Sequence, residues 1–243
     1  MNHVSVLDHG YVKLLNISGP TRRSSAMFDA NDVDPAQAAR MSFDQSFSDR
    51  PQTDDLRLGE YLLKNLHTTP WEMITVWFEM KLPIFLARQF VRHRTVTINE
   101  VSARYVQLPG EWYLPELQDV VLQHKDKKQG GALADLLDSE QRHKAEAFRM
   151  RLQVDCRNSY RRYQESIYDG IAMEQARMHL HVNHYTHWIW KQDLHNLMHF
   201  LSLRSHSHAQ REAQYFAIAI IKLLRQVLPY SMNLFERYRA RGE

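Results

Sequence analysis

Residues 73–81 read Met-Ile-Thr-Val-Trp-Phe-Glu-Met-Lys, a run that is rich in β-branched and aromatic residues. Such residues fit the pleated, half-buried surface of a sheet, so this run predicts a β-strand. The stretch from Pro83 to Arg92 follows it and favours a helix. A strand that leads directly into a helix predicts a mixed fold, and the elements on either side decide its class.

The rest of the chain supplies more helix than strand. Further strands are expected over residues 11–17, 104–114 and 184–190, and helices over residues 34–41, 56–66 and 172–180. Residues 133–168 predict one long helix or two stacked helices, while residues 44–55 and 124–131 predict loops. In the helix over 34–41, Asp34 is the expected cap and Pro35 the first helical residue.

The last helix has the clearest signal. Ser207 and Gln210 form a capping-box pattern, and Pro229 lies just beyond the expected end. Between them apolar residues recur at helical spacing, at Ala213, Phe216, Ala217, Ile220, Leu224 and Leu228. Because the sequence contains no internal repeat, these elements predict a single helix-rich α+β domain over residues 1–243, built around a small and mostly antiparallel sheet.

The composition is typical of a soluble globular protein. Of the 243 residues, 44% are hydrophobic and 24% are charged, and the net charge of +3 is too small to indicate a nucleic-acid partner by itself. The longest apolar run, Tyr215–Ile221, is too short to span a bilayer, and the N-terminus shows no secretory signal. Cys156 is the single cysteine, so no internal disulfide is expected, and a reducing, cytoplasmic location without membrane association is predicted.

Cationic residues are concentrated in residues 88–105. In a helix Arg88 and Arg92 lie on one face at four-residue spacing, where two guanidinium groups repel each other unless an anion lies between them. If the chain is extended after the helix, Glu100, Ser102 and Arg104 point to one side. That side offers an acceptor, a hydroxyl and a forked donor, which suit a polar heterocycle that bears a phosphate. An arginine-rich, solvated turn is the alternative interpretation of the same spacing.

Residues 92–105 read R-H-R-T-V-T-I-N-E-V-S-A-R-Y and resemble the signature of the flavin-dependent thymidylate synthases, R-H-R-x-x-S-x-N-E-x-S-x-R-Y. Eight of the nine fixed positions agree, and Thr97 stands in place of a serine whose hydroxyl it keeps. Other stretches that resemble the family are residues 38–43 (AARMSF), 67–72 (HTTPWE), 174–177 (EQAR) and 201–210 (LSLRSHSHAQ). Residues 122–138 resemble no part of the family that can be aligned.

The resemblance implies methylation of dUMP to dTMP. In that reaction methylenetetrahydrofolate donates the carbon, and FAD, which NADPH has reduced, donates the hydride. The family uses no cysteine nucleophile, in agreement with the position of Cys156 outside every family motif. Electrostatics must then make C5 of the uracil nucleophilic, and by the family match Arg204 is the catalytic residue beside N3 and its neighbouring carbonyl. The helix capped by Ser207 is expected to add partial positive charge next to Arg204.

The resemblance also implies binding roles for single residues. The expected dUMP contacts are Gln89, Arg92, Glu100, Ser102, Arg104 and Arg177. The expected FAD contacts are Ser42, Thr69, His93, Arg94, Asn99, Glu100, Asp193, His195 and His199. His67 is expected on the folate side of the flavin ring. Asp193 and His195 stand where family members often have Asn and Arg, so a weaker attraction for the diphosphate of FAD is expected.

Two other functions stay open as alternatives. His195 and His199 have the spacing of helical metal ligands, within a histidine-rich stretch, residues 179–208, which would suit a metal hydrolase. No H-E-x-x-H arrangement is present, so packing and cofactor contact are favoured and no metal is expected. Residues 88–104 motivate the second alternative, a basic nucleic-acid-binding module, although no nucleic-acid partner is expected. The family resemblance further implies a homotetramer whose active sites form between subunits.

Overall fold

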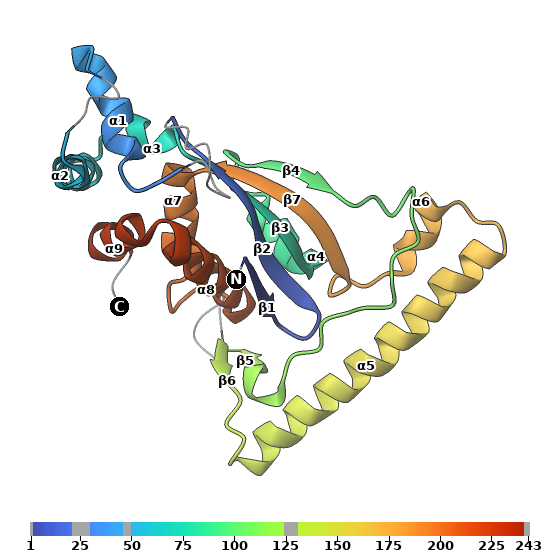
Figure 1. Cartoon of the computed structure of the whole chain (residues 1–243). Helices are drawn as coiled ribbons and strands as arrows, with labels where there is room; N and C mark the ends of the chain where they lie inside the picture. Colours follow the sequence, from blue (N-terminus) through green and yellow to red (C-terminus); the bar gives the residue numbers. More distant parts are fainter. Residues whose placement is uncertain (1, 21–29, 46–49, 124–130, 241–243) are drawn as a thin grey trace.

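A five-stranded antiparallel sheet organises the fold (Figure 1). The computed structural model describes residues 2–20, 30–45, 50–123 and 131–240. The strands lie in the order β1 (His3–Val6), β2 (Gly10–Ser18), β3 (Thr75–Pro83), β7 (Tyr185–Asp193) and β4 (Thr97–Glu100). The central strand, β3, pairs along its whole length with β7, from Thr75 opposite Asp193 to Pro83 opposite Tyr185.

The sheet has one buried face and one open face. On β3 the side chains of Val76, Phe78 and Met80 are fully buried, while Trp77 and Glu79 between them stay partly exposed. β7 alternates in the same way. This period of two follows from the pleat, which turns successive side chains to opposite faces, so the apolar residues of both strands reach the same core.

Helices α7 (Leu194–Arg204) and α8 (Arg211–Val227) pack on the buried face, and α9 (Pro229–Tyr238) packs against α8. Helix α4 (Ile84–Phe90) follows β3 directly and carries Phe90 into the same core. The rings of Trp190, Phe200 and Phe216 meet Phe90 edge to face, with centroids 5.7, 4.9 and 6.2 Å away. Each such pair contributes about 0.5–1.5 kcal/mol beyond the burial of its area, so this aromatic cluster fixes α4, α7 and α8 against the sheet.

Three helices gather at the end of the sheet where β7 leads into α7 (Figure 1). They are α1 (Asp34–Arg40), α2 (Gln52–Lys64) and α3 (Thr69–Glu72). Arg40 Nη2 lies 2.6 Å from Asp55 Oδ1, and this nearly buried ion pair joins α1 to α2. Helix α3 contacts α7, so residues 67–72 are held beside the first turns of that helix.

Helix α5 (Ser139–Tyr168) is a single helix of 30 residues along the outside of the molecule (Figure 1). The Asp138 side chain caps it by accepting hydrogen bonds from the Glu140 and Gln141 N–H groups. Its far end contacts α6 (Met173–Ala176), and the short hairpin of β5 (Val121–Gln123) and β6 (Gly131–Leu133) lies near its beginning. None of the helices in the described ranges is long and apolar enough to cross a bilayer.

The expected class, helix-rich α+β around an antiparallel sheet, is confirmed. The strands predicted over 11–17, 73–81 and 184–190 are present, as are the helices predicted over 34–41, 56–66, 83–92 and 172–180, with shifted ends. The long stretch 133–168 forms one helix rather than two, beginning at Ser139. One core contains residues from Val6 to Phe235, and a single domain over residues 1–243 stays a prediction.

The expected strand over residues 104–114 is wrong. The chain turns there because the Ser102 carbonyl accepts hydrogen bonds from the Tyr105 and Val106 N–H groups, at 3.0 and 3.2 Å. Within this stretch only Trp112 forms a bridge, to His184. The predicted loop over 124–131 lies outside the described residues except for Gly131, which begins β6.

Expected helix starts are also corrected. Asp34 is the first residue of α1 rather than its cap, and its side chain accepts a hydrogen bond from the Asn31 N–H at 2.8 Å. Helix α2 begins at Gln52, inside the predicted loop 44–55. The capping box at Ser207 is wrong, because α8 begins only at Arg211 and has no side-chain cap. Residues 205–209 instead form the turn after α7, a helix with no counterpart among the expected elements.

Leu66, directly before His67, has a backbone φ of 60°, in the left-handed region that disfavours residues with a Cβ atom. Its side chain is 63% exposed, so truncation removes little packing. Leu66→Gly is therefore expected to raise the free energy of unfolding by about 1 kcal/mol. Urea denaturation measures the change, with Lys64→Gly in the last turn of α2 as a control that should lose about 1 kcal/mol. A less stable Leu66→Gly variant would contradict this view of the turn.

Candidate active site

A cavity of about 530 Å³ lies beside the end of β4, within the size range of small-molecule sites. Its lining includes Glu100, Ser102, Arg104 and Arg177, which are four of the residues expected to bind dUMP. The lining residues that the sequence did not single out are Ile84, Val101, Ala103, Leu108, Leu180 and Thr186. Two guanidinium groups, a hydroxyl and a carboxylate thus surround a partly apolar space, which suits an anionic ligand with a flat polar ring.

A turn brings these groups together, and the expectation of a continuous extended chain is wrong beyond Glu100. β4 ends at Glu100, and the Val101 N–H still donates to the His187 carbonyl at 2.8 Å. The chain then turns at Ser102. Arg104 Nε lies 3.4 Å from Ser102 Oγ, and Arg104 Nη2 donates to the Tyr105 hydroxyl at 3.1 Å. The turn, rather than strand alternation, therefore places Ser102 and Arg104 on one side.

Glu100 and Ser102 differ in how they are held. The Thr186 hydroxyl, on the neighbouring strand β7, donates a hydrogen bond to Glu100 Oε1. The hydrogen-bond partners of Ser102 Oγ are the backbone and side-chain nitrogens of Arg104, at 3.4 Å. In the part of the chain that the structure describes, no imidazole or carboxylate hydrogen-bonds to this hydroxyl. The surroundings of Ser102 therefore suit binding rather than nucleophilic attack, which needs an adjacent base.

Arg204 is held by an imidazole. It is the last residue of α7, and its Nε and Nη2 atoms lie 3.3 and 3.2 Å from His93 Nε2. The His93 ring packs edge to face against Phe200, with the centroids 4.9 Å apart. Arg204 lies at the C-terminal end of α7, where the helix dipole is negative, and the helix expected to begin after Ser207 begins only at Arg211.

Burial keeps His93 neutral beside this arginine. Desolvation, assisted by the charges of Arg204 and His199, lowers the pKa of His93 from about 6.5 to about 4. The neutral ring can accept at Nε2 the hydrogen bond that the guanidinium donates. Burial also lowers the pKa of Arg204 from its ordinary value, although an arginine stays protonated at neutral pH. The pair thus presents one positive charge, on the guanidinium, in a partly desolvated place.

The other expected contacts near α4 are more exposed. The Gln89 amide donates a hydrogen bond to Gln210 Oε1, which ties α4 to the residue before α8. Arg92 and Arg94 follow α4 and are exposed. Among the described residues neither has a carboxylate within ion-pair distance. Gln89, Arg92 and Arg204 also lie outside the lining of the cavity beside β4, as judged from the described residues.

The expected FAD contacts are spread over several elements. Ser42 lies in the turn after α1, Thr69 begins α3, and Asn99 lies on β4. His195 and His199 are four residues apart on α7. The Asp193 carboxylate caps α7 by accepting hydrogen bonds from the Asn196 N–H at 2.8 Å and its side-chain amide at 2.9 Å. His67 precedes α3, and its ring lies 6.0 Å from that of Tyr61.

The two sets of expected ligand contacts meet at the end of β4, where Glu100 belongs to both, and otherwise lie on different elements. Figure 1 shows α1, α3 and the start of α7 at one end of the sheet, and α6 toward the opposite side. Most of the expected FAD contacts belong to the first group, whereas Arg177 follows α6 and lines the cavity near Glu100. Within one chain the structure therefore brings together four dUMP contacts, and separately pairs His93 with Arg204.

Comparisons with known proteins identify the family. Residues 26–230 match the family described as thymidylate synthase complementing protein. The chain belongs to the flavin-dependent thymidylate synthase family. It is similar to the flavin-dependent thymidylate synthase of Rickettsia bellii, with 39% identity over 98% of this chain and 80% of that protein. The corresponding protein of Gluconobacter oxydans is 38% identical, over 96% of this chain and 72% of its own length.

A solved structure supports the same relationship. The crystal structure of the UMP/dUMP methylase PolB from Streptomyces cacaoi, bound with 5-Br dUMP, superposes with a TM-score of 0.77. The two proteins are 26% identical, and the match covers 99% of this chain and 100% of the PolB chain. The resemblance inferred from residues 92–105 is thus confirmed, and this member of the flavin-dependent thymidylate synthase family is an enzyme.

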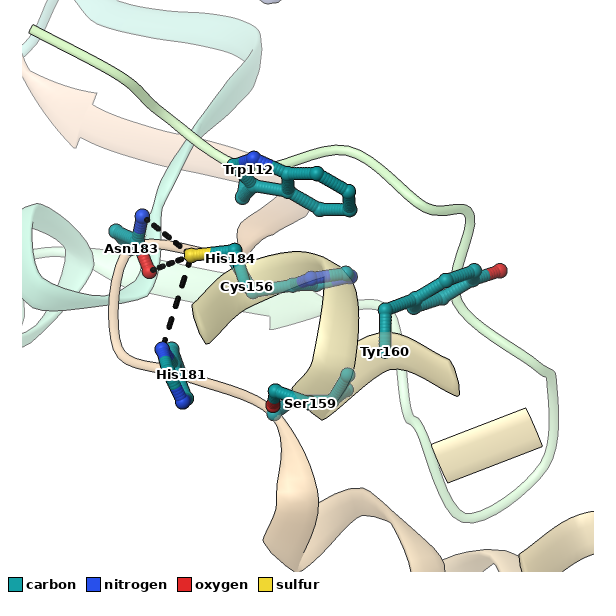
Figure 2. A pocket seen from close by; sticks show the side chains of 8 residues that line it. Trp112, Cys156, Ser159, Tyr160, His181, Asn183 and His184 are labelled. Atoms are coloured by element: carbon teal, nitrogen blue, oxygen red, sulfur yellow. Dashed lines mark hydrogen bonds between the residues drawn. The ribbon is translucent and has the colours of Figure 1, made fainter. Parts of the chain in front are cut away.

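The single cysteine of this family member is enclosed by polar side chains. Figure 2 shows Cys156, on α5, facing His181 and Asn183. Its Sγ atom lies 3.7 Å from His181 Nδ1 and 3.3 Å from Asn183 Nδ2. The pocket around it is small, about 10 Å³, and Trp112 and His184 are among its lining residues. Desolvation raises the pKa of the Cys156 thiol, so the thiolate that a nucleophilic mechanism needs is disfavoured.

The histidine-rich stretch is dispersed in the fold. His184 is buried beside Cys156, and burial lowers its pKa to about 4. His187 lies on the open face of the sheet and contacts Glu79 and Tyr11. In the described ranges no group of three or more His, Cys, Asp or Glu side chains is placed to hold a metal ion.

Two contacts at the site were not evident from the sequence. Thr186 holds Glu100 across the strands β7 and β4, and Gln210 holds Gln89 across two helices. Gln210 belongs to residues 201–210, where the sequence predicts a capping box rather than this contact. Nothing in the sequence pairs Thr186 with Glu100, because that contact depends on the register between β4 and β7.

The low pKa of His93 predicts a loss of stability in acid. Between its unfolded pKa near 6.5 and its folded pKa of about 4, the unfolded chain binds more protons, so stability decreases as the pH falls through this window. Solvent screens this partly exposed ring, and the expected loss is about 1 kcal/mol between pH 7 and 4.5. Urea denaturation should show that His93→Gln loses less stability than the wild type over this range. Equal losses in the two proteins would show that His93 titrates normally.

Proposed function

We propose that this enzyme methylates dUMP to dTMP, with methylenetetrahydrofolate as the carbon donor, FAD reduced by NADPH as the hydride source, and no cysteine nucleophile. The observation that carries the proposal is the cavity lined by Glu100, Ser102, Arg104 and Arg177, in a chain of the flavin-dependent thymidylate synthase family. The PolB structure contains 5-Br dUMP, and its chain shares the fold. The reaction belongs in the cytoplasm and involves neither nucleic acid nor a membrane.

The nucleotide site is assigned to residues with complementary chemistry. Arg104 and Arg177 bind the phosphate through their forked guanidinium donors. Ser102 and Glu100 bind the sugar and the base, since a hydroxyl can donate or accept and a carboxylate accepts from N–H and O–H groups. Gln89 and Arg92 complete the set of dUMP contacts. The absence of a base beside Ser102, among the described residues, supports its role in binding.

Arg204 activates the uracil ring without a covalent bond to the enzyme. A positive charge beside N3 and its neighbouring carbonyl stabilises the negative charge that develops there and raises the electron density at C5. His93 holds the guanidinium at 3.2 Å without neutralising it. Partial burial strengthens the effect, because electrostatic interactions are stronger where water is excluded. The buried thiol of Cys156 takes no part in the reaction. Its raised pKa supports this assignment, because the thiol stays protonated and is a poor nucleophile.

The flavin contacts are Ser42, Thr69, His93, Arg94, Asn99, Glu100, Asp193, His195 and His199. When bound, FAD that NADPH has reduced supplies the hydride that completes the methyl group. The chemistry of these residues fits such a ligand. Hydroxyl, amide and imidazole groups suit the hydrogen-bonding edges of a dinucleotide, and Arg94, which has no carboxylate partner in the described ranges, suits a phosphate. His67, exposed before α3, contacts the folate side of the flavin.

A homotetramer with active sites shared between subunits completes the proposal. The position of Arg204 and of most of the FAD contacts outside the cavity lining supports a site that a second subunit completes. The open face of the sheet and the long exposed helix α5 offer surface for such contacts.

Anaerobic turnover tests the proposed function. The purified full-length protein is incubated with dUMP, methylenetetrahydrofolate, FAD and NADPH, and dTMP is measured by chromatography. Formation of dTMP that requires all four components is the expected result. A parallel reaction with UMP tests the second substrate named for PolB. A folded protein that binds no flavin and forms no methylated product would refute the proposal.

Arg204→Ala is expected to abolish dTMP formation while leaving the fold intact. The substitution removes the charge that activates the ring, and loss of one such electrostatic contact lowers kcat by about 100-fold or more. Circular dichroism and thermal denaturation check the fold, and steady-state kinetics measure the rate. Arg225→Ala, on α8, is the matched control because Arg225 is paired with Glu236 and is not among the residues assigned to dUMP or FAD. Full activity of Arg204→Ala would refute its catalytic role.

Cys156→Ser is expected to keep dTMP formation within about a factor of two of the wild type. The hydroxyl is slightly smaller than the thiol and can still hydrogen-bond Asn183. The same kinetic assay measures the rate. An inactive variant with a native circular dichroism spectrum would contradict the mechanism without sulfur.

A further inference from the structure

The half-buried arginines of the described chain fall into two groups. They are Arg40, Arg149, Arg204, Arg211 and Arg239. The first group has a carboxylate partner: Arg40 pairs with Asp55, Arg149 with Glu116 and Arg211 with Asp119. For Arg204 and Arg239, no described residue offers a carboxylate within 4 Å. These two guanidinium groups are therefore partly desolvated without a counter-charge from the described residues.

Both arginines of the second group contact an imidazole instead. Arg204 Nη2 lies 3.2 Å from His93 Nε2, and Arg239 Nη2 lies 3.4 Å from His195 Nδ1. A neutral imidazole accepts one hydrogen bond from a guanidinium but leaves its charge and its other donors free. A partly buried charge is unfavourable without a partner, so this arrangement suits a site where an anionic ligand supplies the missing charge.

Arg239 reaches the expected flavin contacts from a distant part of the chain. It follows the last residue of α9 and meets His195 in the first turn of α7. His199 lies one turn farther along α7 and contributes to the lowered pKa of both His195 and His93. His195 and His199 share one face of α7, about 6 Å apart along the helix axis, and Arg239 contacts the first of them. This pair forms a strip on α7, whereas Arg204, nine positions beyond His195, lies on the opposite face.

Arg239 brings a positive charge to an end of this strip that also has two acidic neighbours, Asp193 and Glu72. Asp193 accepts two hydrogen bonds from Asn196 at the cap but keeps its negative charge, so an anion bound here requires a cation beside it. Burial and the neighbouring Arg239 lower the pKa of His195, so this ring is neutral at physiological pH. Arg239 is therefore the permanent positive charge at this end of the strip.

We propose that Arg239 is a further flavin-binding residue, whose guanidinium binds the diphosphate that links the two halves of FAD. The inference rests on the proposed function, because it assumes that the strip on α7 holds FAD. Arg239 supplies the attraction for the diphosphate that a neutral His195 cannot supply, and His195 orients the guanidinium through its Nδ1 atom.

Flavin titrations of full-length variants test the proposal. FAD and FMN are titrated into the flavin-free protein, and binding is followed by the change in flavin fluorescence. FMN has the isoalloxazine ring and one phosphate but lacks the adenosine half. Arg239→Ala is expected to weaken FAD binding about tenfold and FMN binding clearly less, because FMN offers one phosphate instead of two. Arg239→Lys keeps the charge without the fork and should give an intermediate loss.

Arg237→Ala is the matched control. Arg237 lies two residues earlier, is more exposed and pairs with Glu60, so its removal changes the net charge equally without touching His195. Its flavin affinities should equal those of the wild type. Circular dichroism and thermal denaturation show whether each variant is folded.

The outcomes separate the inference from the proposed function. Equal FAD affinity in Arg239→Ala and the wild type would overturn the inference. Equal losses for FAD and FMN would overturn it as well, because the contact would then not be specific to the diphosphate. A wild-type protein that binds neither flavin would refute the proposed function, and the inference would fall with it.

Discussion

The pairing of β3 with β7 is the constraint on which the rest of the structure depends. α4 leaves the end of β3 and α7 leaves the end of β7, so the register between these strands sets where the two helices begin. The contact between His93, just after α4, and Arg204, at the end of α7, follows from that register. A shift by one residue would turn the buried Phe78 and Trp190 to the open face and separate the two helices from their common core.

Two half-buried arginines, Arg204 and Arg239, contact a histidine ring instead of a carboxylate. A carboxylate beside Arg204 would position the guanidinium but would also cancel much of its field. His93, kept neutral by burial, positions the group and leaves the field in place for a ligand. Among the half-buried arginines of the described ranges, Arg239 makes the same kind of contact with His195, whereas Arg40 faces the carboxylate of Asp55 and joins two helices.

The sequence was most informative where local signals agree. β-branched and aromatic alternation identified β2, β3 and β7, and helical spacing identified α8, because both patterns arise within one element. β1, β4, β5 and β6 are three or four residues long and depend on their partners. The motif over residues 92–105 identified the family and named three of the residues that line the cavity, Glu100, Ser102 and Arg104. It could not reveal the contacts of Thr186, Gln210 or Arg239, which join distant segments and depend on tertiary packing.

The alternation of side chains along the short strand β4 limits which insertions and deletions it can accept. Asn99 lies opposite Ile189 and Glu100 opposite Trp188, so the two neighbouring side chains project to opposite faces of the sheet. β4 thus presents the Asn99 amide on one face of the sheet and the Glu100 carboxylate on the other. Inserting or deleting one residue ahead of Asn99 would exchange the two groups, whereas a substitution at either position alters only its own side. A change in the length of this strand would therefore disturb both faces of the sheet at once.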